Sequence, residues 1–264
     1  MKKYGFIGTG NMGSALAEAI VKKVGPENVM LNDYDMSKAE KLAGKLSAST
    51  GTKEELAAFA DSIFIGVKPQ ALESMFSEFR KILSDSGRKV TLISMAAGTS
   101  IEKITKLAGD YPVIRIMPNV ACSIGEGMTL CCSNDLVSEE EMAGFISDMS
   151  LSGRCETIPE KLIDAASAVT GCGPAYVFMM AEAMADGAVA CGIPRDKAYT
   201  FAAQTLLGGG KLILESGKTP AELKDSVCSP GGTTIEGVAK LEEGGLRAAV
   251  ISAVRAAYEK NFKL

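Results

Sequence analysis

The 264-residue chain contains no histidine. Histidine is the commonest side chain in general acid or base catalysis and the commonest metal ligand. Its absence leaves any chemistry to a cofactor, to carboxylates, hydroxyls and lysines, or to backbone groups. The sequence therefore predicts no metal centre, and an enzyme built on this chain would depend on a bound cofactor.

An excess of positive charge is also missing, because 28 Lys and Arg stand against 32 Asp and Glu for a formal net charge of −4. Such a chain has no long-range attraction to nucleic-acid phosphates or acidic lipids. No uninterrupted apolar run reaches the roughly 20 residues that a membrane-spanning helix needs. The start of the chain does not resemble a secretory signal. We expect neither nucleic acid nor a membrane as a partner.

The seven cysteines are an odd number and include no C-x-x-C pair. This pattern favours reduced thiols over a disulfide framework or a zinc site. Because reduced thiols are typical of the cytoplasm, we predict that location.

Short β-branched runs alternate with amphipathic helical patterns through the first 160 residues, as in βα units on a parallel sheet. We expect strands at residues 4–7, 29–33, 62–67, 90–95, 113–117, 128–132 and 155–158. After Pro159 only helical patterns remain, at residues 160–169, 174–191, 194–216, 220–226, 234–243 and 246–262. The predicted fold is α/β, with a Rossmann-type doubly wound parallel sheet over residues 1–159 and an all-helical domain over residues 160–264.

Charge is almost absent from Ala165–Ala190, where only Glu182 and Asp186 interrupt the apolar sequence. A helix that is apolar nearly all round must be buried on most sides, which a domain of about 100 residues cannot easily do alone. We predict a homodimer formed through the helical domain.

The first expected strand leads into the pattern G-x-G-x-x-G at Gly8, Gly10 and Gly13, and a helix follows. In dinucleotide-binding folds the first glycine makes a tight turn, the second admits the pyrophosphate and the third lets helix and strand pack closely. The helix N-terminus adds free N–H donors for the phosphates. This context predicts an NADH or NADPH site.

Asp33 ends the second expected strand, 20 residues past Gly13, where an acid binds the adenosine ribose hydroxyls. Its charge would repel a 2′-phosphate, so Asp33 favours NADH; the alternative is a solvated turn residue. Lys68 and Asn119 follow later strands and could reach the cofactor, although Lys68 could also be an ordinary surface lysine. The predicted cofactor-binding residues are Ile7, Gly8, Thr9, Gly10, Asn11, Met12, Gly13, Asp33, Val67, Lys68, Pro69, Ala97 and Asn119.

Near the C-terminus the segment SPGGTT at residues 229–234 opens an expected helix. Thr233 and Glu236 have the spacing of a capping box, and the pair Gly244-Gly245 would end the helix. A glycine-bearing loop with hydroxyls and free N–H groups suits a small carboxylate. In isolation, the same pattern is also that of an ordinary capped helix.

Taken together, several segments resemble the pyrroline-5-carboxylate reductase family over essentially the whole chain. They are GTGNMG at 8–13, VKP at 67–69, AAG at 96–98, MPN at 117–119, GPAY at 173–176 and KDSVCSPGGTT at 224–234. The resemblance implies reduction of 1-pyrroline-5-carboxylate to L-proline, the last step of proline biosynthesis, by an NADH- or NADPH-dependent oxidoreductase. It also implies interlocked helical domains, in dimers that assemble into larger rings.

The resemblance further implies roles for single residues. Ser229, Gly232, Thr233 and Thr234 would surround the substrate carboxylate, with the Thr234 hydroxyl near the ring nitrogen as the catalytic group. Glu160 would lie close to the imino acid, although a carboxylate in the first turn of a helix is also a favourable helix-dipole partner. Asp33 departs from the family, which often has residues suited to a 2′-phosphate at this position.

Two other functions stay open. A β-hydroxyacid dehydrogenase has a similar architecture but needs a base for the hydroxyl proton, and those enzymes carry a lysine on the helix after the inter-domain glycines. Here no lysine follows Gly171–Pro174 until Lys197. A dinucleotide-binding protein without turnover is the second alternative, and an activity assay distinguishes it.

Overall fold

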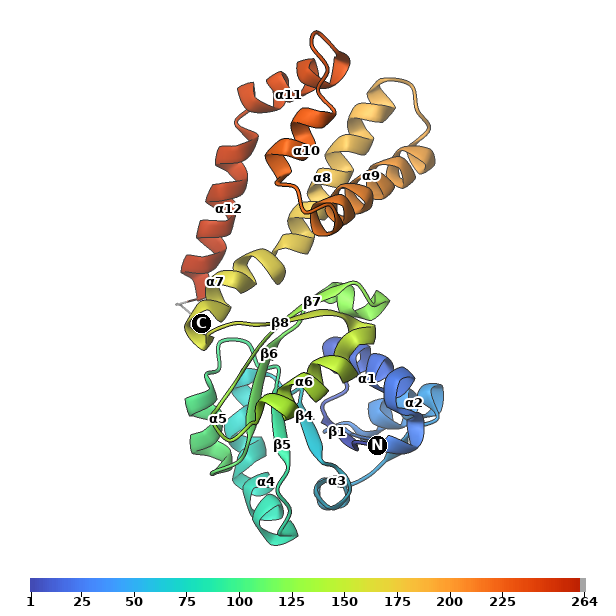
Figure 1. Cartoon of the computed structure of the whole chain (residues 1–264). Coiled ribbons are helices and arrows are strands. Elements are labelled where there is room, and N and C mark those ends of the chain that lie inside the picture. The colour runs from blue at the N-terminus through green and yellow to red at the C-terminus, as the bar shows by residue number, and fades with distance from the viewer. Residues whose placement is uncertain (262–264) are drawn as a thin grey trace. The chain divides into compact units, whose positions relative to one another are not determined.

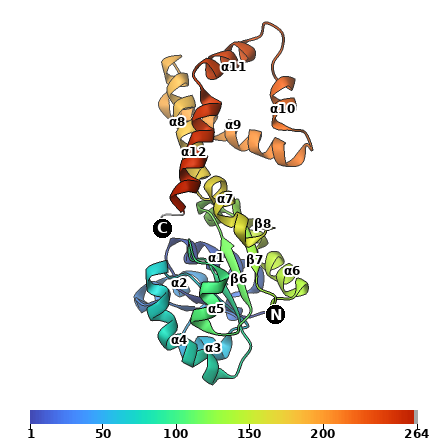
Figure 2. The same cartoon turned by 90° about the vertical axis from the view of Figure 1, so that its left-hand side faces the viewer.

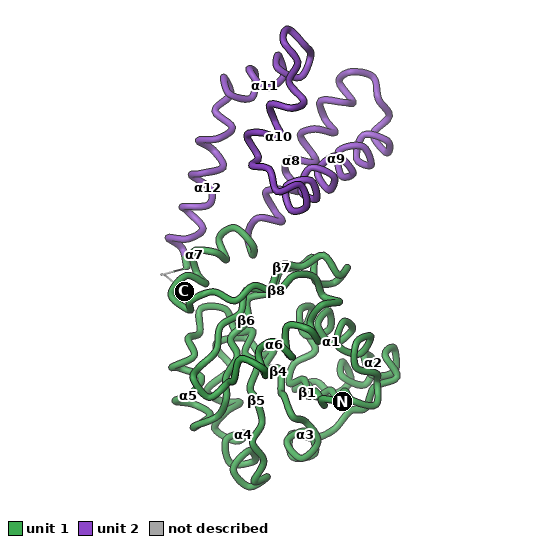
Figure 3. Tube along the Cα trace, viewed as in Figure 1, with its two compact units in different colours: residues 1–171, 261–264 green, residues 172–260 purple. Residues whose placement is uncertain are grey.

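The computed structural model describes residues 1–261. The described residues form two compact units, one of residues 1–171 together with Asn261, the other of residues 172–260 (Figure 3). Helix α7 (Glu160–Thr170) belongs to the first unit, so the two units divide after Gly171.

The first unit is built on one eight-stranded sheet of order β3-β2-β1-β4-β5-β6-β7-β8 (Figure 1). The strands are β1 (Tyr4–Ile7), β2 (Val29–Asn32), β3 (Ser49–Thr50), β4 (Ser62–Ile65), β5 (Thr91–Ser94), β6 (Val113–Met117), β7 (Gly127–Ser133) and β8 (Gly153–Thr157). The first six are parallel and have the doubly wound order, with the strand order reversing between β1 and β4. The predicted fold class is confirmed.

Strand β7 departs from the predicted parallel sheet, because it runs antiparallel to β6. Residues 118–126 connect the two strands and contain only the 3-10 helix η3 (Val120–Ile124). A parallel neighbour would need a crossover of a dozen or more residues. Helix α6 (Glu139–Asp148) supplies such a crossover one step later, and β8 is parallel to β7.

Helices cover both faces of the sheet (Figures 1 and 2). Phe6 and Phe64 stack at 4.4 Å between ring centroids in one core. Ile7 and Ile65, one position further along the same strands, belong to the other core. This alternation is what a strand period of two produces when both faces are buried. The first core includes α1 (Asn11–Val24), α2 (Met36–Leu46) and α6; the second includes α3 (Lys53–Phe59), α4 (Leu72–Ser86) and α5 (Ile101–Ala108).

The second unit is helical throughout, as predicted. Its helices are α8 (Gly173–Ala190), α9 (Arg195–Glu215), α10 (Pro220–Ser226), α11 (Thr233–Glu243) and α12 (Leu246–Asn261), of which the last residue belongs to the first unit. The predicted end of the last helix at residue 262 lies outside the described residues. Three further 3-10 helices, η1 (Pro26–Asn28), η2 (Pro69–Ala71) and η4 (Met149–Ser152), lie in the first unit.

Helix α8 leaves most of its apolar surface uncovered in a single chain. Ala185 is its one buried residue, whereas Val177, Phe178 and Met179 are 49%, 64% and 68% exposed. Large apolar side chains in such a row indicate an interaction surface. The stretch Glu160–Ala190 is also long and apolar enough to cross a membrane by length and composition alone, which is weak evidence for one such helix. A turn at residues 171–172 separates α7 from α8 within it.

Candidate cofactor and substrate sites

Two of the three fingerprint glycines are required by the fold itself. Gly8 has φ of +102°, and a Cβ there would lie 2.6 Å from the carbonyl oxygen of Gly66. A Cβ on Gly13 would lie 2.2 Å from the carbonyl oxygen of Gly8. Both distances are far below van der Waals contact, so the turn after β1 and the close packing of α1 admit only glycine.

Gly10 is different, because nothing in the protein requires a glycine there. Its φ is −64°, which any residue adopts, and apart from its own chain neighbours no atom of residues 1–261 lies within 4 Å of the position of a Cβ. Gly10 is the exposed N-cap of α1, where the first N–H groups of the helix have no intrahelical partner. The space beside Gly10 and these donors suit the close approach of an anionic ligand such as a pyrophosphate.

Asp33 follows β2 and is bound to the glycine loop. Its Oδ2 accepts hydrogen bonds from the Thr9 amide at 2.6 Å and the Thr9 hydroxyl at 2.9 Å, and its Oδ1 accepts one from the Asp35 amide at 3.0 Å. Partial burial acts to raise the pKa of Asp33, but these hydrogen bonds outweigh it and hold the pKa below its ordinary value. Asp33 is therefore ionised at neutral pH.

A cavity of about 750 Å³ lies beyond the ends of β1 and β2 and contains Asp33 in its lining. The predicted residues Ile7 and Val67 also line it, as does Tyr34, whose side chain is fully exposed. Lys53 and Glu78, which form an ion pair with each other, line it as well. Neither was predicted, because the two lie 25 residues apart on α3 and α4 and only the tertiary fold joins them.

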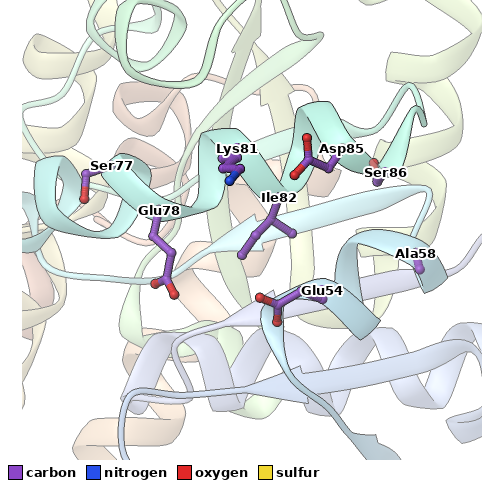
Figure 4. Close-up of a pocket in the computed structure, with 8 residues that line it drawn as sticks. All are labelled: Glu54, Ala58, Ser77, Glu78, Lys81, Ile82, Asp85 and Ser86. Atoms are coloured by element: carbon purple, nitrogen blue, oxygen red, sulfur yellow. The ribbon is translucent and has the colours of Figure 1, made fainter.

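A second cavity of about 510 Å³ lies between α3 and α4 (Figure 4). Glu54 and Glu78 line both cavities, so the two cavities are neighbours. Lys81 and Asp85 add opposite charges to its lining. It includes none of the predicted site residues.

The remaining predicted cofactor residues also lie where parallel strands end. Asn11 and Met12 begin α1 after β1, Lys68 and Pro69 follow β4, and Ala97 follows β5. Lys68 and Ala97 are exposed, and the Lys68 ammonium makes no ion pair within residues 1–261. Carboxyl ends of neighbouring parallel strands lie at one edge of a sheet, which brings these residues to the edge that carries Gly10 and Asp33.

Asn119, after β6, has its amide engaged within the protein. Nδ2 donates to the carbonyl oxygen of Thr170 at 2.9 Å, and Oδ1 accepts from the amides of Ala121 at 3.2 Å and Met128 at 3.3 Å. Asn119 thus joins the end of β6 to the end of α7 and to β7. Its predicted contact with a cofactor or substrate stays a prediction.

Glu160 belongs to a charged cluster at the start of α7. Its Oε1 accepts from the Ile101 amide, the first of α5, at 2.7 Å and lies 3.1 Å from Nη1 of Arg115. Nη2 of Arg115 lies 3.1 Å from Asp164. Burial, with the Glu160 charge nearby, raises the pKa of Cys132 to about 11, so that thiol stays protonated at neutral pH. Glu160 therefore joins the start of α7 to the start of α5 and to Arg115. Its contact with the substrate stays a prediction.

We expect Arg115→Met to lower the free energy of unfolding by about 2 kcal/mol. The Arg115 side chain is only 6% exposed, so its removal leaves two carboxylates without their cation, which costs about 3–5 kcal/mol in a fully buried site. Glu160 and Asp164 are 33% and 41% exposed, and solvent screening reduces that cost. Urea denaturation measures the loss.

Arg88→Met is the matched control for this change. The Arg88 guanidinium pairs with Asp61, and the two side chains are 39% and 43% exposed. We expect a loss below about 1 kcal/mol there. An equal, small loss in both variants would contradict a stabilising role of the Arg115 cluster.

Residues 229–232 form a tight turn, and α11 follows directly at Thr233. The Gly232 amide bonds to the Ser229 carbonyl at 3.0 Å, and Gly231 has φ of +65°. Proline in second place and a positive-φ glycine in third are the preferences of a type II turn. The predicted capping box of Thr233 and Glu236 was wrong, because the N-cap is Gly232 and Thr233 is already the first helical residue.

This correction leaves the loop hydroxyls without partners. Ser229, Thr233 and Thr234 are exposed, and their side chains make no hydrogen bond within residues 1–261. Thr219, at the start of α10, shows the contrast, because its hydroxyl accepts from the Glu222 amide in a complete capping box. Three uncommitted hydroxyls at a helix N-terminus form a suitable cradle for a small anion.

Comparison with known proteins identifies the relatives of this chain. A family model described as pyrroline-5-carboxylate reductase dimerisation matches residues 160–264. The pyrroline-5-carboxylate reductase of Escherichia coli is 41% identical over 100% of this chain and 98% of the relative. The chain belongs to the pyrroline-5-carboxylate reductase family. A relative from Danio rerio, pyrroline-5-carboxylate reductase 3, is 41% identical over 98% of this chain and 90% of the relative's length.

Solved structures of the family agree with this assignment. The reductase of Coxiella burnetii is similar with a TM-score of 0.92 at 29% identity, covering 99% of this chain and 98% of that one. The Plasmodium falciparum enzyme, solved with NADP bound, has a TM-score of 0.83 at 31% identity over 98% and 97% of the two chains. Residues 3–98 match a model described as NADP oxidoreductase coenzyme F420-dependent.

Membership in the family accounts for the uncovered apolar surface of the helical part. The dimerisation model spans that part, so the exposed side chains of α8 belong to a region that mediates homo-oligomerisation. The model begins at residue 160, whereas the compact units divide after Gly171. The predicted domain boundary at residue 159 therefore stays a prediction.

Proposed function

We propose that this chain reduces 1-pyrroline-5-carboxylate to L-proline with NADH or NADPH, the last step of proline biosynthesis. The observation that carries the proposal is the segment 229–234, in which three hydroxyls at the N-terminus of α11 make no hydrogen bond to any described residue. It occurs in one chain with a complete dinucleotide fingerprint, in a family whose curated members bear this activity in their names.

The glycine loop and the strand ends would hold the cofactor. The open space at Gly10 and the N–H groups of α1 would receive the pyrophosphate, and Asp33 the adenosine ribose. Lys68 would approach a phosphate or ribose, and Asn119 would lie near the nicotinamide end. When bound, the reduced nicotinamide supplies the hydride for the C=N carbon of the substrate.

The helical domain would hold the substrate through its carboxylate. Ser229, Thr233 and Thr234 would donate hydroxyl hydrogen bonds, and Gly232 would contribute its backbone without the bulk of a Cβ. The Thr234 hydroxyl would orient the ring nitrogen and assist its protonation. A protonated cyclic imine is already electrophilic, so the chain mainly has to position its ligands and exclude water, which requires no histidine.

The assembly would be a homodimer through the helical domain, with dimers joined into a larger ring, in the cytoplasm. The apolar side chains exposed along α8 and α9 support the dimer. The net charge of −4 supports an enzyme without nucleic-acid or membrane partners.

The loss of absorbance at 340 nm with 1-pyrroline-5-carboxylate and either NADH or NADPH tests the proposed reaction. We expect turnover with at least one cofactor. The absence of turnover with both would refute the reductase, and a series of 2-methyl-branched hydroxyacids would then test the dehydrogenase alternative. Binding of either cofactor without turnover of any substrate would identify a non-catalytic dinucleotide-binding protein.

We expect Asp33→Ala to shift the cofactor preference from NADH towards NADPH by about 30-fold in the ratio of kcat/KM. The change removes a ribose hydrogen bond to a charged acceptor and a repulsion on the 2′-phosphate, each worth about 1 kcal/mol or more. Asp35→Ala, at an exposed neighbour, is the control. A wild type that prefers NADPH, or an unchanged ratio, would contradict this role of Asp33.

A further inference from the structure

We propose that Thr9 is a positioning residue for cofactor selection, which acts by holding the Asp33 carboxylate in the orientation that recognises NADH. This inference rests on the proposed NADH site at Asp33 and adds a second residue to it. The fingerprint pattern requires glycine on either side of position 9 but leaves the residue there open.

Each polar group of Thr9 makes a hydrogen bond within the protein. Its amide and its hydroxyl both donate to Oδ2 of Asp33, at 2.6 and 2.9 Å, and its carbonyl oxygen accepts from the Ser14 hydroxyl at 2.8 Å. The side chain is 6% exposed, whereas Asp33 lines the 750 Å³ cavity. Thr9 therefore contacts the carboxylate from the protein side and acts on a ligand only through Asp33.

As a result, the two carboxylate oxygens of Asp33 differ in their remaining capacity to accept hydrogen bonds. A carboxylate oxygen accepts about two hydrogen bonds, so Oδ2 is saturated by Thr9. Within residues 1–261, Oδ1 accepts one hydrogen bond, from the Asp35 amide, and retains one acceptor position. A ribose hydroxyl can donate to that position. A 2′-phosphate brings further acceptor oxygens and negative charge instead, so the fixed carboxylate rejects it.

The connection also joins the two halves of the cofactor site. Thr9 stands between Gly8, whose amide bonds to the Asn32 carbonyl at 2.8 Å, and Gly10, where the pyrophosphate would approach. The Asp33 carboxylate, which would bind the ribose, is thus held by the same glycine loop that would bind the phosphates. Loss of the Thr9 hydroxyl removes one of the two hydrogen bonds to Oδ2, so the remaining bond from the Thr9 amide holds the carboxylate less firmly.

The test compares Thr9→Val, which keeps the amide and the shape, with Thr9→Ser, which keeps the hydroxyl. Dissociation constants for NADH and NADPH are measured by titrating nicotinamide fluorescence, and kcat and KM for each cofactor are measured with 1-pyrroline-5-carboxylate. We expect Thr9→Val to reduce the preference for NADH about tenfold through KM, with kcat nearly unchanged, because the charge-assisted hydrogen bond that orients the carboxylate is lost. Thr9→Ser should retain most of the preference.

Thr105→Val is the matched control, since among the described residues the Thr105 hydroxyl bonds only to the Ile101 carbonyl of its own helix, at 3.0 Å. Equal weakening of NADH and NADPH in Thr9→Val would indicate a merely structural role and overturn the proposal. So would a Thr9→Ser variant that behaves like Thr9→Val. A wild type that turns over the substrate but shows no change of preference in Thr9→Val overturns this inference alone, whereas a wild type that binds neither cofactor overturns the proposed function as well.

Discussion

Thr234→Ala is expected to lower kcat/KM for 1-pyrroline-5-carboxylate by about 100-fold or more, the range in which a positioned proton donor contributes. The hydroxyl would be lost from the ring nitrogen and from the carboxylate cradle at once. The fold should be unaffected, because Gly232 is the N-cap of α11 and the Thr234 hydroxyl bonds to nothing within residues 1–261. The 340 nm assay measures the loss.

Thr219→Ala is a matched control from the neighbouring helix. Its hydroxyl caps α10, so we expect a loss of about 1 kcal/mol in stability with turnover retained. Thr219→Ala would then lose stability and keep its activity, whereas Thr234→Ala would lose activity and keep its stability. Wild-type turnover in Thr234→Ala would show that the substrate is protonated and oriented by another group.

Gly10→Ala is expected to weaken NADH binding about 100-fold while the thermal midpoint stays that of the wild type. The backbone of Gly10 has an ordinary φ and open space at the Cβ position, so the fold accepts a methyl group. That methyl group would occupy the space that the pyrophosphate needs, and small displacements in a positioned site cost about this much. Titration of NADH fluorescence and differential scanning calorimetry measure the two quantities.

Gly13→Ala, in the same loop, should behave in the opposite manner. Its Cβ would lie 2.2 Å from the Gly8 carbonyl oxygen, so the folded state itself is destabilised. A Gly10→Ala protein that binds NADH with wild-type affinity would show that the dinucleotide does not approach the loop at this residue.

The sequence was most informative where a local pattern has a local cause. Tyr4–Ile7, Val113–Met117 and Pro220–Ser226 begin and end at the predicted residues. Each is bounded by glycine, proline or capping residues that interrupt the periodicity nearby. The expected strands and helices, the fingerprint loop and the unburied apolar face of α8 follow from spacings of a few residues.

Long-range pairing explains the direction of β7, whereas a local turn explains the start of α11. The direction of β7 depends on the length of one connection and on which edge strand it meets, and the alternation of its residues does not record direction. The start of α11 moved by one residue because the turn at Gly231 and Gly232 closes on Ser229, so the glycine takes the N-cap place that a threonine would otherwise prefer.

By itself, the sequence determined the fold class, the dinucleotide loop, the hydroxyl-bearing turn and the need for a partner chain, because each depends on residues close together along the chain. Tertiary structure alone decided which polar groups are already engaged. Asn119 and Glu160 bond to groups on other elements, and Thr9 binds Asp33 across 24 residues. In the part of the chain that the structure describes, the hydroxyls of Ser229, Thr233 and Thr234 make no hydrogen bond. The physical reason is that a hydrogen bond depends on distance in space, and only folding brings groups from distant positions within about 3 Å of each other.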